Sequence, residues 1–330
     1  MSSPVASARA RLFGLLCAAA LLAGCTTAST AGTPRTHSAR TTVPASASTT
    51  AKVDTAFSAS ALRTVDPCGL LDQKTLSQLG KPSARVNQNQ IDACSADLDD
   101  GSGKSLNVEV VIGDDLASST PTGTIAGLPV KEESDSTECA ENLITQHNPT
   151  TGIEVRAVYT GTASCVYARQ LAGLVVNRIR TNAPHRPSGV NSLVLIDPCD
   201  TIAESDVENL TAVGPDKSVE GLFKCDWLAG GYDLSVQFTL DGNPKDETFE
   251  GTPQPVDVGV PAYAFPSNDV FPSCDVKWQV RTVTPAGSGD DEQGEVVDVQ
   301  FGNVLGGTAD PCTQAEVAAK LVATKVPHGS

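Results

Sequence analysis

The sequence predicts an α+β protein of two similar tandem domains. Each is expected to be a twisted antiparallel sheet packed with a short N-terminal helix and a C-terminal helix, and stapled by disulfides. Three observations support this. An Asp-Pro-Cys motif at 66–68 returns at 197–199, the next cysteine lies 26 positions further on in both places (Cys94 and Cys225), and alternating apolar segments separated by turn residues follow each motif. Such a registered repeat indicates two copies of one unit.

Composition bounds the size and the partners. The chain has 330 residues, of which 40% are hydrophobic, enough for two domain cores. Its formal charge of -16 argues against binding nucleic acid, because phosphates require Lys and Arg opposite them. It also argues against lying flat on an anionic membrane. Ten cysteines favour an oxidising compartment.

Residues 1–25 are predicted to be a lipoprotein signal peptide. Two arginines precede an apolar stretch at 12–22, which is too short to span a bilayer as a helix. The segment Leu22-Ala23-Gly24-Cys25 resembles the bacterial lipobox. That resemblance implies cleavage before Cys25 and acylation of its thiol with diacylglycerol, with fatty-acyl groups such as palmitate. The expected location is therefore the extracytoplasmic face of the cell membrane, held there by a lipid anchor.

Residues 26–60 are predicted to be a disordered tether. Ser, Thr, Ala and Pro dominate this stretch and apolar periodicity is absent. Such a segment buries too little apolar surface to offset its chain entropy. At roughly 5–6 Å × √n, about 35 residues would span about 30–35 Å.

The first domain is predicted at 61–181. Asp66-Pro67 begins a turn, and a short helix follows with Asp72 as N-cap and Gly80 as its end. Alternation of apolar and polar residues predicts strands around Cys94, at 106–110 and at 153–159. A C-terminal helix is indicated by an apolar stripe, which comprises Leu171, Leu174, Val175 and Ile179.

After a linker at 182–192, the second domain is predicted at 193–327 and repeats the same order. Strands are expected at 234–238, 276–280 and 297–301, and a last helix is expected to begin after Asp310-Pro311-Cys312. Thr313 and Glu316 have the spacing of a capping box at the start of that helix.

Each predicted domain carries four cysteines. Four cysteines allow three connectivities, and the matching spacing favours sequential pairing. The expected disulfides are Cys68–Cys94, Cys139–Cys165, Cys199–Cys225 and Cys274–Cys312. Closely spaced Cys-x-x-Cys knuckles, which zinc sites use, are absent, so no metal site is expected.

No local motif indicates catalysis. The stretch 101–105 ends like a phosphate-binding loop, but Leu98 occupies the position of the required leading glycine, so a hairpin loop is expected. The four histidines stand in the tether, loops, linker and tail, outside any metalloprotease pattern. We therefore expect a protein without catalytic residues or a cofactor.

Acidic residues cluster at 97–100 and at 290–295, without the spacing of a calcium loop, so solvated loops are expected.

The formal charge is unequal between the two copies. From residue 191 onward there are 23 acidic against 7 basic residues, whereas 62–190 has 15 against 11. Two explanations stay open, a cationic partner of the second copy or a solubility device. Trp227 and Trp278 lie in alternating segments and are expected in the core.

A family resemblance rests on the lipobox, the Ser/Thr-rich tether, Asp66-Pro67-Cys68-Gly69-Leu70-Leu71 and Gln78-Leu79-Gly80. In these features the chain resembles an actinobacterial family of cell-envelope lipoproteins defined as a domain of unknown function. More remotely it resembles the extracytoplasmic sensor domains of actinobacterial Ser/Thr kinases. The resemblance implies a non-enzymatic binding or sensing module for an envelope ligand or protein partner. The alternative is a cell-envelope hydrolase that uses carboxylates in a cleft.

Overall fold

A computed structural model describes residues 54–328 except 89, 117–119, 148, 162, 187–190, 250, 269, 288–291 and 305. Residues 52–330 form one compact unit, to which both sheets belong. The predicted signal peptide, Cys25 and the tether up to residue 53 lie outside the described residues. None of the described helices is long and apolar enough to cross a bilayer.

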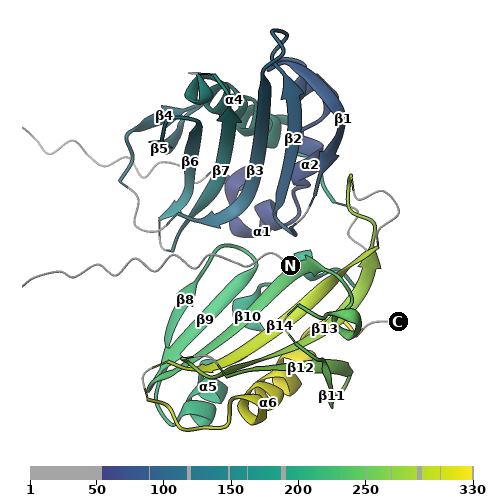
Figure 1. Cartoon of the computed structure of the whole chain (residues 1–330). Coiled ribbons are helices and arrows are strands. Elements are labelled where there is room, and N and C mark those ends of the chain that lie inside the picture. Colours follow the sequence, from purple (N-terminus) through teal and green to yellow (C-terminus); the bar gives the residue numbers. More distant parts are fainter. Residues whose placement is uncertain are drawn as a thin grey trace, which may run out of the picture. The chain divides into compact units, whose positions relative to one another are not determined.

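The first sheet has seven antiparallel strands in the order β1-β2-β3-β7-β6-β5-β4 (Figure 1). Its strands are β1 (Lys81–Asn87), β2 (Ala93–Asp99), β3 (Ser105–Asp115), β4 (Gly123–Ile125), β5 (Leu128–Ser134), β6 (Glu138–His147) and β7 (Thr150–Tyr159). Strand β7 lies at the centre of the sheet and pairs with both β3 and β6, so the three longest strands of this sheet are neighbours.

The second sheet repeats this topology strand for strand. Its order is β8-β9-β10-β14-β13-β12-β11, and all pairs are again antiparallel. The strands are β8 (Asp216–Val219), β9 (Lys224–Ala229), β10 (Tyr232–Asp241), β11 (Gln254–Asp257), β12 (Pro261–Ser267), β13 (Ser273–Val283) and β14 (Gln293–Asn303). The α+β class with two tandem antiparallel sheets is thereby confirmed.

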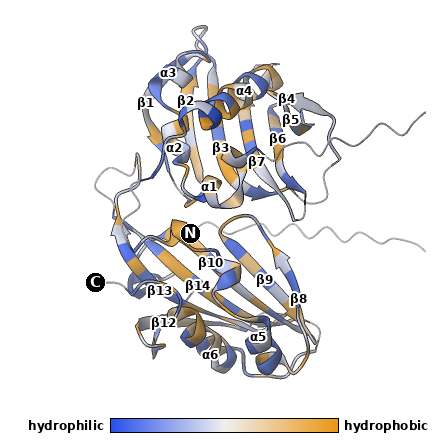
Figure 2. Cartoon of the chain, turned by 180° about the vertical axis from the view of Figure 1, so that it is seen from behind, coloured by the Kyte–Doolittle hydropathy of each residue, from blue (hydrophilic) through white to orange (hydrophobic). Residues whose placement is uncertain are grey.

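Helices cover one face of each sheet. In the first domain α4 packs on β6 and β7, and in the second α6 packs on β12, β13 and β14 (Figure 2). The first-domain helices are η1 (Thr55–Phe57), α1 (Ala59–Arg63), α2 (Pro67–Leu70), α3 (Gln73–Leu76) and α4 (Ser164–Asn182). Those of the second are η2 (Leu193–Leu195), η3 (Pro198–Asp200), α5 (Glu204–Thr211), η4 (Pro244–Asp246) and α6 (Pro311–Ala323).

The N-terminal turn-helix forms as its capping residues dictate. Asp66 accepts the N–H of Cys68 at 3.0 Å, and Asp72 accepts the N–H of Thr75 at 2.8 Å, as predicted for the N-cap. The predicted turn at Asp66-Pro67 begins a short helix of its own, α2, and the helix capped by Asp72 ends at Leu76 rather than at Gly80. In the second copy the cap of α6 is Asp310, which accepts the N–H of Thr313 at 2.8 Å, and not Thr313 itself.

The four predicted disulfides are the four that the structure contains, with Cα–Cα distances of 4.9–5.1 Å. In each copy the first bridge ties the Asp-Pro-Cys turn to the second strand of the sheet. The second bridge ties the sheet to the start of the C-terminal helix. In each domain the disulfides therefore link the sheet to the N-terminal turn and to the C-terminal helix.

The core lies between each sheet and its helices. Apolar and polar residues alternate along the strands (Figure 2), which buries one face of each sheet. Trp227 and Trp278 are fully buried there, as predicted. Their burial makes them part of the packing rather than a surface for ligand.

Candidate functional site: a cavity between the two domains

One backbone contact between the two domains joins β3 to the loop before β9, and another joins Gln88 to the carbonyl oxygen of Ala286. The N–H of Leu222 donates to the carbonyl oxygen of Gly113 at 2.9 Å. Gly113 has φ +82° and a Cβ at this position would overlap the Leu222 side chain. Gly221 has φ +78° and would bring a Cβ within 2.6 Å of the Gly113 oxygen. Glycine is therefore required twice, for its backbone conformation and for the close approach.

An ion pair fastens the same contact. Arg63 at the end of α1 pairs with Asp197, the N-cap of η3, and its Nε donates to the carbonyl of Leu222 at 3.3 Å. The Arg63 side chain is 11% exposed and that of Asp197 31%. One arginine thus contacts both the N-cap of η3 and the loop before β9.

A cavity of about 530 Å³ lies beside this contact and is lined by both domains. The β10 end and the loop before β9 supply one wall, and the start of β2 with the end of β3 supplies the other. Its charged lining residues are Asp92, Asp114, Asp115, Glu220, Lys224 and Asp241. Five carboxyl groups therefore line the cavity together with one lysine.

Among the carboxyl groups of the cavity, Asp114 has a clearly raised pKa. Burial, and after it the nearby carboxylates of Glu154, Asp92 and Asp115, raise its pKa to about 6. Burial also raises the pKa of Asp92. A half-buried carboxyl among other carboxyls keeps an unfavourable charge that a cationic group in the cavity would offset.

The single lysine of the cavity is already paired. Lys224 lies 2.6 Å from Glu220 and 3.1 Å from Asp226, a neighbour on β9 just outside the lining. Burial and the hydrogen bond with Glu220 raise the pKa of Asp226 to about 7. Because Lys224 is shared by two carboxyl groups, it does not compensate Asp114. The guanidinium of Arg186 acts on Asp92 and lowers the pKa of that carboxyl, against the effect of burial.

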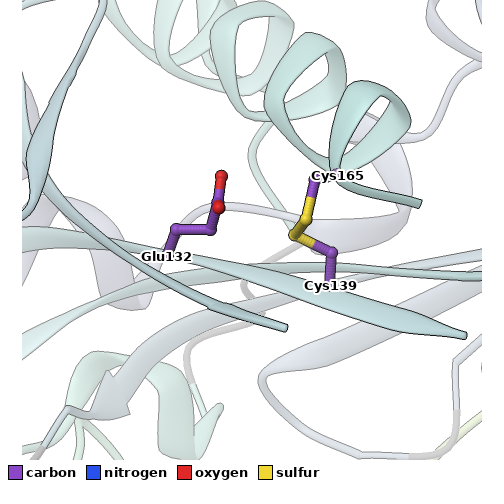
Figure 3. Close-up of side chains that lie close together, drawn as sticks. All are labelled: Glu132, Cys139 and Cys165. Atoms are coloured by element: carbon purple, nitrogen blue, oxygen red, sulfur yellow. A yellow bond between two sulfur atoms is a disulfide. The ribbon is translucent and has the colours of Figure 1, made fainter. Parts of the chain in front are cut away.

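A second acidic group lies in the first domain, far from the cavity in sequence. Glu132 lies within 4.8 Å of both sulfurs of the Cys139–Cys165 disulfide (Figure 3). Among the described residues this is the only set of three ligand-type side chains close enough to share a metal ion. Its sulfurs are bonded to each other and offer no thiolate, so the set does not fit a metal site.

The predicted acidic clusters do not form the site. Asp99 and Asp100 accept backbone N–H groups of the 100–104 loop, which closes the hairpin expected there. Asp290 and Asp291 lie outside the described residues, and Glu292 is exposed. The cavity acids were missed because they stand singly or in pairs, at strand ends and in loops of two copies that lie more than a hundred positions apart. The one feature of the sequence that could have indicated them is their position at or next to the ends of strands.

The comparisons with known proteins found no match for this chain. No family model matches the sequence, and neither the curated proteins nor the solved structures contain a significant match.

Proposed function

We propose that the protein is a cell-envelope lipoprotein, anchored through Cys25 on the extracytoplasmic face of the membrane. In this proposal its folded part is a non-enzymatic binding or sensing module. Support for the anchor comes from the lipobox-like segment 22–25 and the Ser/Thr-rich segment behind it. Mass spectrometry of the mature protein would show an N-terminal acylated Cys25. A mature N-terminus at another residue would contradict the anchor.

The ligand site of this module is the cavity between the domains, and its ligand is an organic cation. The observation that carries this is the lining of five carboxyl groups with one already paired lysine. A basic peptide or a polyamine has both charge and length to reach several of these carboxylates.

Titration calorimetry with spermidine and with trilysine tests this assignment. We expect binding that weakens steeply between low and physiological salt, since exposed charges are screened over roughly 8–10 Å. Asp114→Asn and Glu220→Gln should each weaken binding by about tenfold. Asp216→Asn, at an exposed position outside the cavity, is the matched control and should leave the affinity unchanged. Binding that ignores both cavity variants would contradict the assignment.

One observation favours a hydrolase as the alternative. Asp114 and Asp226 have pKa values of about 6 and about 7, in the range useful for a general acid near neutral pH. Release of reducing sugar from isolated cell envelopes, lost in Asp114→Asn and retained in Asp216→Asn, would establish the hydrolase. Absence of turnover together with cation binding would establish the binding module.

A further inference from the structure

The Cys139–Cys165 disulfide joins two cysteines in unlike surroundings. Cys139 on β6 is fully buried, whereas Cys165 is half-buried at the second position of α4. Helix α4 has 19 residues, and its N-cap Ala163 makes no side-chain cap. The open N–H groups of a helix N-terminus favour negative charge and lower the pKa of a thiol placed there.

One carboxyl group stands beside this bridge, and a second is paired with it. Glu132 on β5 and Glu141 on β6 are direct partners across the strands, and Glu132 lies within 4.8 Å of both sulfurs. Glu141 is only 1% exposed, and its Oε1 accepts no hydrogen bond. Arg169, one turn after Cys165, forms ion pairs with both, at 3.3 Å from Glu141. Burial and the Glu132 charge raise the pKa of Glu141 to about 7.

The second copy contains the equivalent disulfide without a carboxyl pair beside it. The equivalent bridge, Cys274–Cys312, also joins a fully buried strand cysteine to a half-buried one at the start of a helix. Val276 and Ala264 occupy the places of Glu141 and Glu132, paired across β13 and β12. Glu316 takes the place of Arg169, and Asp310 caps α6. The carboxyl pair is therefore dispensable for folding such a domain.

We propose that Cys139–Cys165 is an exchange-competent disulfide that reacts with dithiols, with Glu132 and Glu141 as its proton relay. This reaction is independent of the cavity between the domains. Only the first copy carries it. The other three bridges are structural.

The exchange proceeds in two balanced steps. A thiolate of the dithiol attacks Sγ of Cys165, the less buried of the two cysteines, which forms a mixed disulfide and breaks the Cys139–Cys165 bond. The electron pair of that bond passes to Cys139 Sγ, which takes the proton shared by Glu132 and Glu141. The second thiol of the dithiol then gives its proton to this carboxyl pair. Its thiolate attacks the mixed disulfide, and Cys165 leaves as a thiolate while the dithiol becomes a disulfide.

Partial reduction of the full chain with dithiothreitol tests the proposal. Quenching in acid, alkylation and peptide mapping give the rate for each bridge. We expect Cys139–Cys165 to open about tenfold faster than Cys274–Cys312, which is its control for exposure and helix position. Divided by the dithiothreitol thiolate concentration, its rate should fall as pH rises through about 7, where the carboxyl pair loses its proton.

Two variants separate proton relay from packing. Glu132→Gln, at a half-exposed position, and Glu141→Gln, at a buried one, should each remove both the excess rate and the fall above pH 7. Melting temperature confirms that each is folded, and the wild-type comparison of the two bridges needs no variant. Equal rates for the two bridges, or a pH profile that survives in both variants, would overturn the proposal.

Discussion

Two glycine residues allow the backbones of the two similar domains to approach each other closely. Gly113 and Gly221 both have positive φ, and each lies where a side chain would meet the other domain. Neither looks unusual in a sequence with 28 glycines. The sequence therefore predicts turns at such positions, while the contact that requires glycine depends on atoms from a distant segment.

Gly113→Ala should destabilise the protein by two separable effects. An alanine at φ +82° is strained by about 1 kcal/mol, and overlap with Leu222 adds about 1–3 kcal/mol. Gly101→Ala is the matched control, because Gly101 has φ +84° with nothing within 4 Å of a Cβ. Chemical denaturation of both variants isolates the inter-domain contact. Equal losses would show that this contact adds nothing.

Asp114→Asn should change how stability depends on pH. The folded-state pKa of about 6 lies above the ordinary value, so the folded protein holds this proton more tightly. Its contribution to stability is present below about pH 4 and is lost as pH rises through about 6. Relative to wild type, the variant should gain about 1–2 kcal/mol between about pH 4 and 8. Urea denaturation measures this, with Asp216→Asn as control, and a parallel shift in both would refute it.

At the scale of elements, the sequence predicts a helix or strand well where one face of the element is apolar and, for a helix, where its first turn is capped. The turn at Asp66-Pro67, the cap at Asp72 and the strands β3, β7, β10, β13 and β14 follow from such patterns. Strand β6 escaped prediction because six consecutive residues are buried, among them Glu141 and Asn142. A strand buried on both sides has no alternation, and the short edge strands have too few residues to show it.

The first disulfide of each copy should contribute equally to stability. Cys68–Cys94 and Cys199–Cys225 both join cysteines 26 positions apart, so the chain-entropy model assigns about 3.5 kcal/mol to each. Replacing both cysteines of either bridge by alanine should therefore lower the free energy of unfolding of its domain by similar amounts. Guanidinium denaturation under non-reducing conditions compares them. A difference above about 2 kcal/mol would mean that native packing, rather than loop closure, dominates.

At the scale of the whole molecule, the cavity depends on a joint that the repeat itself does not require. Each sheet is complete without the other, so duplication alone would allow two independent domains. The contacts of Arg63 and Leu222 tie residues more than a hundred positions apart. Such pairing is invisible to sequence periodicity, which explains why the fold was predictable and the candidate site was not.

Breaking that joint should uncouple the unfolding of the two domains. Both tryptophans lie in the core of the second domain, so their fluorescence reports on that domain alone, whereas far-ultraviolet circular dichroism reports on both sheets. In the wild type we expect coincident transitions by the two probes. Arg63→Ala leaves Asp197 and the Leu222 carbonyl without their partner, and should separate the midpoints. Lys131→Ala, which removes an exposed ion pair within the first domain, is the control and should keep them coincident. Separate transitions already in the wild type would show that the joint is too weak to hold a cavity.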